Sequence, residues 1–297
     1  MKVGIMNDLD FQLQDRIIFI QELAKQYDLS KAYISFSGGK DSVVLSYLFD
    51  LALPNNTIER VYFNTGIEYN LMIQFVKDLA KTDNRIKIIN SGKNVRQTLE
   101  KVGYPFKSKE HSTKLNMYQN GSKANSVSKY LNNESFGCPK ALKEQFTQDY
   151  NLKISSSCCK EFKKDIAKKY QKENNKSIKI LAMRREEKEQ RAKLKCISKT
   201  KTITNINPLA PITEELEEYI IKKYNIKLCP LYYEPYNFKR TGCKGCPYNL
   251  NLKEDLETMR KLLPNEYKQC YYIWGKVYNE YKRLNYRLDK YEKLNLF

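Results

Sequence analysis

Residues 37–42 read Ser-Gly-Gly-Lys-Asp-Ser and lie between a β-forming run, residues 32–36, and a helical pattern over residues 43–53. Paired glycines let the backbone turn tightly and approach an anion, and amides at the start of a helix bind phosphate oxygens. The lysine adds positive charge, and the serines add hydroxyl donors. A glycine pair alone is also typical of a plain turn before a helix, and the GxxxxGK[ST] pattern is absent. The whole hexapeptide predicts a phosphate-binding loop made of Ser37, Gly38, Gly39, Lys40, Asp41 and Ser42.

Strand and helix patterns alternate along much of the chain. We expect strands at residues 32–36, 58–63, 85–90 and 177–182. We expect helices at residues 10–27, 43–53, 70–81, 95–102, 140–150, 159–170 and 214–224, and two more within 252–290 that break at Pro264. Thr213 is expected to cap the helix over 214–224. This alternation predicts an α/β fold with a parallel sheet.

In three segments the apolar residues show neither helical nor strand spacing. Residues 105–136 are polar and predict a long loop with one helix, close to the site and mobile. Residues 183–201 predict a charged loop, and residues 229–250, rich in Pro, Tyr, Gly and Cys, predict no regular element. We divide the chain into a nucleotide-binding domain, residues 1–210, and a helical region, residues 211–297.

Composition bounds the class of protein. The chain has 53 Lys and Arg against 34 Asp and Glu, a net charge of +19, and residues 101–200 alone hold 24 basic and 10 acidic groups. Such a surface attracts polyanions, although lysine-rich composition also serves solubility. No run approaches the ~18 apolar residues of a membrane-spanning helix, and the N-terminus gains acids where a signal peptide needs an apolar run. We therefore expect a cytoplasmic protein without membrane contact, whose eight cysteines serve metal, redox or catalytic chemistry rather than disulfides.

Three arginines follow the strand expected to end at residue 182. Arg184, Arg185 and Arg191 carry planar guanidinium groups that bind phosphate or sulfate in a bidentate way. Ligands of open α/β sheets bind outside the carboxyl ends of the strands, which is where these side chains begin. The alternative is a charged surface turn in which the arginines pair with Glu186, Glu187 and Glu189.

An ordered series of motifs resembles the phosphoadenosine phosphosulfate (PAPS) reductase family within the PP-loop ATP pyrophosphatases. Besides residues 37–42, these are Phe-Asn-Thr-Gly-Ile-Glu-Tyr at 63–69, Tyr-Pro-Phe-Lys-Ser-Lys at 104–109, Ala-Met-Arg-Arg-Glu-Glu at 182–187 followed by Arg191, and Asn-Pro-Leu at 207–209 followed by Thr213. The resemblance spans about residues 30–275. It departs from the family at Ile212, where a Trp is common.

The resemblance implies an adenine nucleotide alpha hydrolase-like fold, with a helical, cysteine-containing C-terminal part. It implies that ATP binds with Mg²⁺ and that Lys40, Asp41 and Arg184 act in catalysis. It adds Thr65, Gly66 and Lys109 to the loop and the three arginines as nucleotide- or phosphate-binding residues. Reductases of the family usually have a degenerate loop, so the complete loop of this chain favours ATP.

The cysteines add a second candidate site. Cys243 and Cys246 form a C-x-x-C turn that can ligate one metal or cluster, and Cys158 and Cys159 are adjacent. This pair followed by C-x-x-C resembles the 4Fe–4S ligand set of assimilatory adenylylsulfate reductases. Zinc is the second choice, unligated thiols remain an alternative, and Cys270 is an alternative fourth ligand. Three other cysteines are expected to be ordinary small residues: Cys138, Cys196 and Cys229.

Three functions follow. The first is an iron–sulfur PP-loop enzyme that splits ATP to AMP and pyrophosphate and adenylates an acceptor for sulfur transfer, with nucleic acid as an acceptor that suits the basic middle third. The second is an adenylyl sulfate or PAPS reductase, opposed by the lack of a cysteine after Cys270, where such enzymes carry their nucleophile in the tail. The third is a nucleotide-sensing or nucleic-acid-binding component without catalysis.

The single histidine, His111, is expected to be structural or to line the entrance of the site. Whether the chain binds a protein partner or forms a homo-oligomer stays open.

Overall fold

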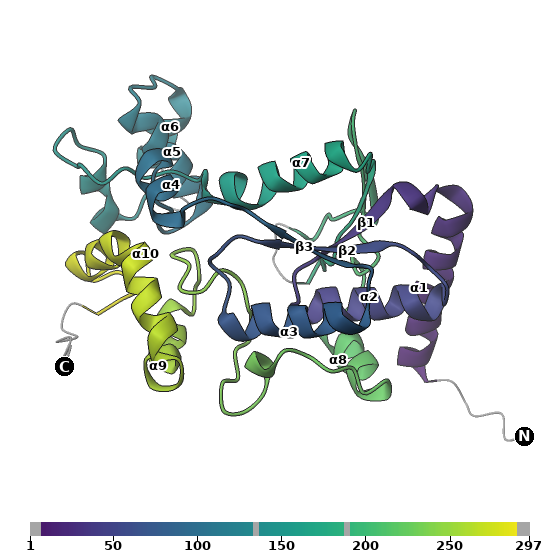
Figure 1. The fold of residues 1–297 in the computed structure, drawn as a ribbon. Coiled ribbons are helices and arrows are strands. Elements are labelled where there is room, and N and C mark those ends of the chain that lie inside the picture. The colour runs from purple at the N-terminus through teal and green to yellow at the C-terminus, as the bar shows by residue number, and fades with distance from the viewer. Residues whose placement is uncertain (1–6, 133–136, 187–190, 290–297) are drawn as a thin grey trace, which may run out of the picture. The chain divides into compact units, whose positions relative to one another are not determined.

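The computed structural model describes residues 7–132, 137–186 and 191–289. Its strands are β1 (Ala32–Phe36), β2 (Glu59–Asn64), β3 (Ile86–Asn90), β4 (Ile178–Ile180), β5 (Ile197–Lys199) and β6 (Thr204–Ile206). Its α-helices are α1 (Asp8–Gln26), α2 (Lys40–Ala52), α3 (Asn70–Thr82), α4 (Val95–Val102), α5 (Lys109–Gln119), α6 (Asn125–Asn132), α7 (Asp165–Glu173), α8 (Glu214–Lys223), α9 (Leu252–Leu262) and α10 (Pro264–Arg283), as Figure 1 shows. No described helix is long and apolar enough to cross a membrane.

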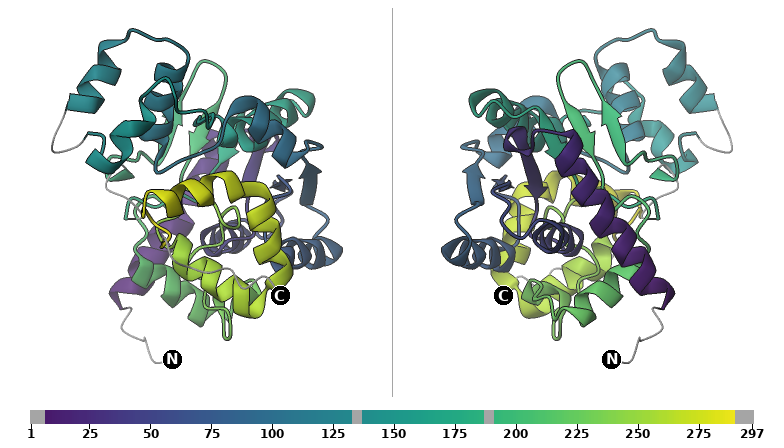
Figure 2. Two further views of the ribbon diagram at one scale, coloured as in Figure 1. Left: turned by 90° about the vertical axis from the view of Figure 1, so that its left-hand side faces the viewer. Right: turned by 90° about the vertical axis from the view of Figure 1, so that its right-hand side faces the viewer.

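The strands form one six-stranded sheet in the order β3-β2-β1-β4-β6-β5. Among the described strands, the pairs β1–β2, β2–β3, β1–β4 and β4–β6 are parallel, and the β5–β6 pair, joined by its turn in Figure 2, is antiparallel. The predicted α/β fold with a parallel sheet is confirmed. Strand order reverses between β1 and β4, and the carboxyl edge at such a switch point is where open α/β sheets bind ligands.

The chain divides into two compact units. The first comprises residues 1–64, 70–90 and 167–241, and therefore holds the whole sheet. Apolar residues of α1, α2 and α8 pack on one face of the sheet in a single buried cluster. On the other face of the sheet, where Figure 1 shows α7, Tyr170 of that helix packs against Tyr33 and Val61. The helices thus cover both faces, as a parallel sheet requires.

The second unit comprises residues 65–69, 91–166 and 242–297. Helix α10 supports the loop at 243–247 from one side. The indole of Trp274 is fully buried and donates to the carbonyl of Lys244 at 3.0 Å. One turn onward, Tyr278 donates to the carbonyl of Gly245, and Tyr281 donates to that of Pro247 at 2.8 Å. These bonds hold an irregular loop that lacks a backbone ladder of its own. The predicted domain boundary between residues 210 and 211 stays a prediction.

Several sequence predictions need correction. The prediction of one helix within 105–136 is wrong, because that segment holds both α5 and α6. Helix α5 begins where the Ser108 side chain accepts from the amide of His111, and α6 buries Val127 and Tyr130 on one face. Residues 140–150 hold only a short 3-10 helix, Lys140–Gln145. The loop predicted over 183–201 contains strand β5.

Candidate functional site

The loop at residues 37–42 joins β1 directly to α2 in the first unit. Gly38 has a φ of +72°, and a Cβ there would lie 2.5 Å from Met72 Sδ of α3, so both conformation and space require glycine. Ser42 donates to the Gly39 carbonyl at 2.8 Å and also accepts from the Ser37 amide at 3.2 Å. The two serine hydroxyls lie 3.1 Å apart. The loop is therefore closed by its own serines at the start of a 13-residue helix.

A tyrosine that the sequence did not single out caps this helix. The Lys40 amide donates to the Tyr232 hydroxyl at 3.1 Å, and that hydroxyl lies 2.6 Å from Thr241 Oγ1. Tyr232 comes from the Pro-Tyr-rich segment predicted to be irregular, where the structure has only a short 3-10 helix, Pro230–Tyr232. The segment thus contributes a hydroxyl to the first free amide of the helix.

Arg184 follows β4, on the other side of the strand-order reversal from the loop. Its Nε donates to Asp41 Oδ1 at 2.7 Å, and its NH1 lies 3.4 Å from Glu186 Oε2. The Arg184 side chain is only 8% exposed. The predicted catalytic residues Asp41 and Arg184 are thus brought into direct contact at the carboxyl edge of the sheet.

Glu217 of α8 completes this cluster and was missed by the sequence analysis. Its side chain is fully buried, 3.3 Å from Lys40 Nζ and 3.4 Å from Arg184 NH2, and neither carboxylate oxygen has a hydrogen-bond partner. Burial and the charge of Asp41 raise its pKa, Arg184 and Lys40 lower it, and the net effect raises the pKa of Glu217 to about 7. Burial lowers the pKa of Lys40, but the carboxylates of Glu217 and Glu214 more than offset this, so the pKa lies above its ordinary value.

The other two arginines are placed differently. Arg185 donates from Nε to the carbonyl of Leu194 at 2.9 Å, so its guanidinium is bonded to the backbone of its own loop. The Arg191 carbonyl accepts from the Leu194 amide at 2.8 Å. Of the proposed acidic partners, Glu186 contacts Arg184, whereas Glu187 and Glu189 lie outside the described residues.

Thr65, Gly66 and Lys109 belong to the second unit. Thr65 is fully buried, and both its amide and its hydroxyl donate to the Glu68 carboxylate, at 2.9 and 2.7 Å. Gly66 has a φ of +82°, which this tight turn requires. Lys109 is exposed at the first position of α5. The structure therefore assigns these three residues to a different compact unit from the phosphate loop.

Four cysteines gather in the second unit. Cys158 and Cys159 lie in the first turn of a helical stretch that widens to a π-turn over Lys160–Lys164 before α7. Burial raises the pKa of Cys158, and the charges of Cys243, Cys159 and Cys246 raise it further. Burial and then Cys243 and Cys159 also raise the pKa of Cys246, to about 12. All four thiols are thus close enough to influence one another electrostatically.

A lysine accompanies these thiols. The charge of Cys243 raises the pKa of Lys163, and Glu68 and Cys159 contribute in the same direction. Conversely, burial raises the pKa of Cys243 while Lys163 opposes that rise. Lys163 was also missed by the sequence analysis. It lies in the π-turn, a helix irregularity that is common at functional sites.

Cys270 packs against Gly245 of the C-x-x-C turn. Its Sγ would be 2.7 Å from a Cβ on Gly245, whose φ is +60°, and it lies 3.9 Å from Met259 Sδ. Burial raises the pKa of Cys270 to about 12, and the charged groups that act on it are Lys244, Glu266 and Asp255 rather than the other thiols. The remaining cysteines, Cys138, Cys196 and Cys229, are free thiols.

Cys158, Cys159, Cys243 and Cys246 are the four thiols that the sequence pattern groups as candidate ligands. Four thiols are the ligands that a 4Fe–4S cluster takes, and a neighbouring cation offsets their negative charge. Within residues 7–132, 137–186 and 191–289, no three His, Cys, Asp or Glu side chains form a group that could hold a single metal ion.

His111 is fully buried in the second unit. Its Nδ1 lies 2.9 Å from the Tyr130 hydroxyl, and its Nε2 lies 2.9 Å from Gln145 Oε1. Burial lowers the pKa of His111 to about 4, so the ring is neutral at physiological pH. The predicted structural role agrees with these contacts.

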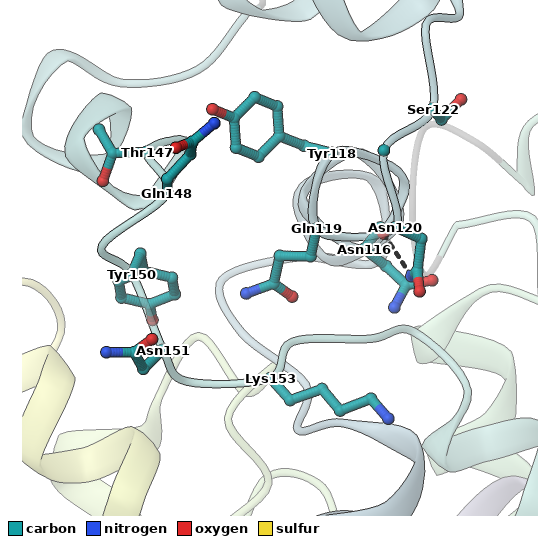
Figure 3. A pocket seen from close by; sticks show the side chains of 11 residues that line it. Asn116, Tyr118, Gln119, Asn120, Ser122, Thr147, Gln148, Tyr150, Asn151 and Lys153 are labelled. Carbon is teal, nitrogen blue, oxygen red and sulfur yellow. Dashed lines mark hydrogen bonds between the residues drawn. The ribbon is translucent and has the colours of Figure 1, made fainter.

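An open polar pocket of about 680 Å³ lies in the same unit (Figure 3). It is lined by Asn116, Tyr118, Gln119, Asn120, Gly121, Ser122, Thr147, Gln148, Tyr150, Asn151 and Lys153. None of these residues is acidic. Asn116 and Gln119 are fixed by bonds to the carbonyls of Ile154 and Leu152, at 3.1 and 2.9 Å.

The chain matches a protein-family model over two overlapping stretches. Residues 31–138 and 130–249 match the model of the phosphoadenosine phosphosulfate reductase domain. An uncharacterized protein of Methanocaldococcus jannaschii is 40% identical over 73 residues, which are 25% of this chain and 17% of that protein. The aligned part thus spans less than a fifth of the length of this relative.

Solved structures give more distant matches. A PAPS reductase from Candida auris, a phosphate complex, is 13% identical with a TM-score of 0.46, covering 82% of this chain and 98% of that one. The FMN adenylyltransferase of Candida glabrata is 12% identical with a TM-score of 0.49, covering 86% and 75%. The U34-tRNA thiolase of Methanococcus maripaludis, with its [4Fe-4S] cluster, is 14% identical with a TM-score of 0.38, covering 89% and 79%.

Proposed function

We propose, from the premise that this chain belongs to the phosphoadenosine phosphosulfate reductase domain family, that its loop at residues 37–42 binds ATP. The observation that carries the proposal is the cluster of Lys40, Asp41 and Arg184 around a complete glycine loop at the sheet's switch point. The loop amides, an ammonium and a guanidinium are the groups that proteins use to bind phosphate oxygens. A loop closed by Ser37 and Ser42 is already shaped for an anion before ligand arrives.

The proposed reaction splits ATP, bound with Mg²⁺, between its α and β phosphates. An acceptor oxygen attacks the α-phosphorus, the bond to the bridging oxygen breaks, and pyrophosphate leaves with that electron pair. Lys40 and Arg184 stabilise the negative charge that develops on the pyrophosphate. Such stabilisation is largest where the cations are already oriented toward the leaving group. Asp41 orients Arg184 by accepting the hydrogen bond that Arg184 Nε donates. A sulfur nucleophile from a donor then attacks the acceptor carbon that carries the adenylated oxygen, and AMP leaves with that oxygen and the electron pair of the broken C–O bond.

Cys158, Cys159, Cys243 and Cys246 are the residues that we propose to hold a 4Fe–4S cluster, with zinc as the second choice. When bound, such a cluster supplies iron that can exchange an electron or ligate sulfur. Lys163 offsets the negative charge of the thiolates. All eight cysteines are free thiols, which is consistent with the reducing cytoplasm that we propose as the location.

The acceptor that we propose is a nucleic acid. The basic excess of residues 101–200 supports a polyanionic partner. The polar pocket around Asn120 and Lys153 supports it as well, because its amides and tyrosines suit hydrogen bonding to bases and stacking on them.

Product analysis tests the proposal. Anaerobic protein is incubated with ATP and Mg²⁺, and pyrophosphate and AMP are measured with and without RNA. In parallel, sulfite release is measured from adenylyl sulfate and PAPS with a thiol donor. Pyrophosphate with equimolar AMP supports the proposal. Sulfite without pyrophosphate supports the second candidate, a reductase, which the family description and the cysteine pattern favour. Nucleotide binding without either product identifies a nucleotide-sensing component.

A further inference from the structure

Glu217 is a buried carboxylate for which the proposed reaction has no use. It lies on α8 with its side chain fully buried, and neither of its oxygens has a hydrogen-bond partner. A buried charge without such bonds is costly unless cations compensate it. Here those cations are Lys40 and Arg184, at 3.3 and 3.4 Å. These are the same two cations that the proposed function assigns to the phosphates.

The negative charge of Glu217, together with that of Asp41, nearly balances the positive charges of Lys40 and Arg184. Lys40 and Asp41 face Glu217 from α2, and Arg184 faces it from the segment after β4. On α8 itself, Glu214 lies 3.5 Å from Lys40 Nζ, but its side chain is 64% exposed, so water screens that pair. Asp41 has its own bond to Arg184. Of the two carboxylates on α8 that pair with Lys40, Glu217 is therefore the buried one.

We propose that Glu217 is a positioning residue. Its carboxylate pairs with Lys40 and Arg184 and holds them at the loop, and these ion pairs are replaced by pairs with phosphate oxygens when the ligand binds. The inference rests on the proposed function and deepens it. Two anions cannot share the same two buried cations at full strength, since their mutual repulsion in a poorly solvated site is large. Glu217 thus weakens the hold of the site on a free anion and favours release of pyrophosphate.

A pH dependence follows from this competition. The pKa of Glu217 is raised to about 7, so the carboxylate is neutral below that pH and charged above it. Neutral Glu217 leaves both cations to the incoming anion. If binding requires the neutral form, the competent fraction falls about tenfold from pH 6 to pH 8, and the apparent affinity falls with it. Anion binding should therefore take up a proton at pH 8.

Sulfate is the probe, because it keeps the same double negative charge from pH 6 to 8.5 and stands in for a phosphate group. Calorimetric titration with wild-type protein should give a dissociation constant about tenfold larger at pH 8 than at pH 6. Glu217→Gln should bind sulfate about tenfold more tightly than wild type at pH 8, with no change between the two pH values. Glu217→Asp should keep the pH dependence. Glu218→Gln removes the same charge from an exposed neighbour on α8 and should behave as wild type.

Equal affinity and an equal pH profile for wild type and Glu217→Gln overturn the inference. If Glu217→Gln does not fold, titrations of wild type at pH 8 in two buffers of different ionisation enthalpy decide instead: uptake of close to one proton per sulfate supports the inference, and no uptake overturns it. Sulfate binding that follows the predicted profile, in a protein that releases no pyrophosphate from ATP, leaves the inference standing while the proposed reaction fails. Absence of sulfate binding at every pH overturns the inference, whereas release of pyrophosphate from ATP decides the proposed function separately.

Discussion

Arg184 Nε lies 2.7 Å from Asp41 Oδ1, and the two residues are 143 positions apart in the sequence. This bond connects the start of α2 to the segment that leaves β4, the two elements on either side of the strand-order reversal. It fixes a guanidinium, only 8% exposed, beside the glycine loop. A planar group held in this way can present its remaining N–H donors to an anion without first losing much side-chain freedom.

Replacing Arg184 tests this arrangement. Arg184→Ala should weaken ATP binding by about tenfold to a hundredfold, because a charge-assisted hydrogen bond contributes roughly 1.5–3 kcal/mol. Arg184→Lys should recover only part of the affinity, since an ammonium cannot both pair with Asp41 and reproduce the planar fork. Equilibrium binding of ATP at fixed salt measures both. Arg96→Lys, in the second unit, is the control, and equal affinities for Arg184→Ala and the control contradict the assignment.

The cysteine variants test the proposed cluster. Anaerobically purified protein should be brown and hold about four irons, the content of one 4Fe–4S site. Cys243→Ser and Cys246→Ser should lose both iron and colour, and the C-terminal region should become less stable because ligation contributes to folding. Iron and sulfide analysis with thermal unfolding measures these effects. Cys196→Ser is the control and should keep its iron.

Cys270→Ser separates the two ligand sets. Because Cys270 packs against Gly245 and Met259, the variant should keep its iron and lose only some stability. Bleaching by Cys270→Ser, with colour retained in Cys158→Ser or Cys159→Ser, would instead make Cys270 a ligand. Stoichiometric zinc in the purified protein would rule out the iron–sulfur assignment.

Lys163 should matter to the same site through its charge. Lys163→Gln removes the cation that opposes the rise in the pKa of Cys243, so the thiolate forms less readily and holds metal less tightly. We expect faster loss of iron to a chelator at pH 7 and a smaller difference at higher pH, where the thiols ionise without help. Lys164→Gln, which removes the charge of the adjacent lysine, is the matched control. Equal rates for the two variants would show that Lys163 has no part in metal retention.

The sequence predicted the elements that local signals determine. The hexapeptide joins β1 to α2 and includes the start of that helix, because its glycines and serines need only their immediate neighbours to close the turn. Thr213 caps α8 by accepting from the Leu216 amide at 3.1 Å. The strands β5 and β6 were missed because each is a three-residue run with a single isoleucine among polar residues, and their pairing comes from the sheet.

The missed site residues have a different cause. Glu217 lies in an acidic run on a polar helix, which in sequence is typical of a solvated face, and it is buried only because Lys40 and Arg184 reach it from remote segments. Lys163 is one of several lysines between residues 160 and 169, and nothing local distinguishes it from its neighbours. Side chains that act through long-range pairing leave little trace in one sequence.

Acid should destabilise the fold through His111. Its pKa is lowered from 6.5 to about 4 by burial, so between these values the unfolded chain binds a proton that the folded protein does not. Stability is therefore full above pH 6.5, falls as the pH drops, and levels off below about 4, a loss on the order of 3 kcal/mol. Denaturant unfolding of wild type and His111→Gln at pH 7.5 and 5 measures it. A difference between the two proteins that is the same at both pH values contradicts this origin.

Salt dependence tests the nucleic-acid acceptor. If residues 101–200 bind a single-stranded RNA by its phosphates, the logarithm of the association constant should fall linearly with that of the salt concentration, by ~0.7 per phosphate contact. Lys153→Ala, in the polar pocket, should weaken binding and reduce that slope by about one contact. Lys261→Ala removes an exposed charge from α9 and should leave the slope unchanged. Fluorescence anisotropy with a labelled oligonucleotide measures both quantities. Failure to bind RNA even at low salt would leave the basic charge without a nucleic-acid role and would favour a small-molecule acceptor.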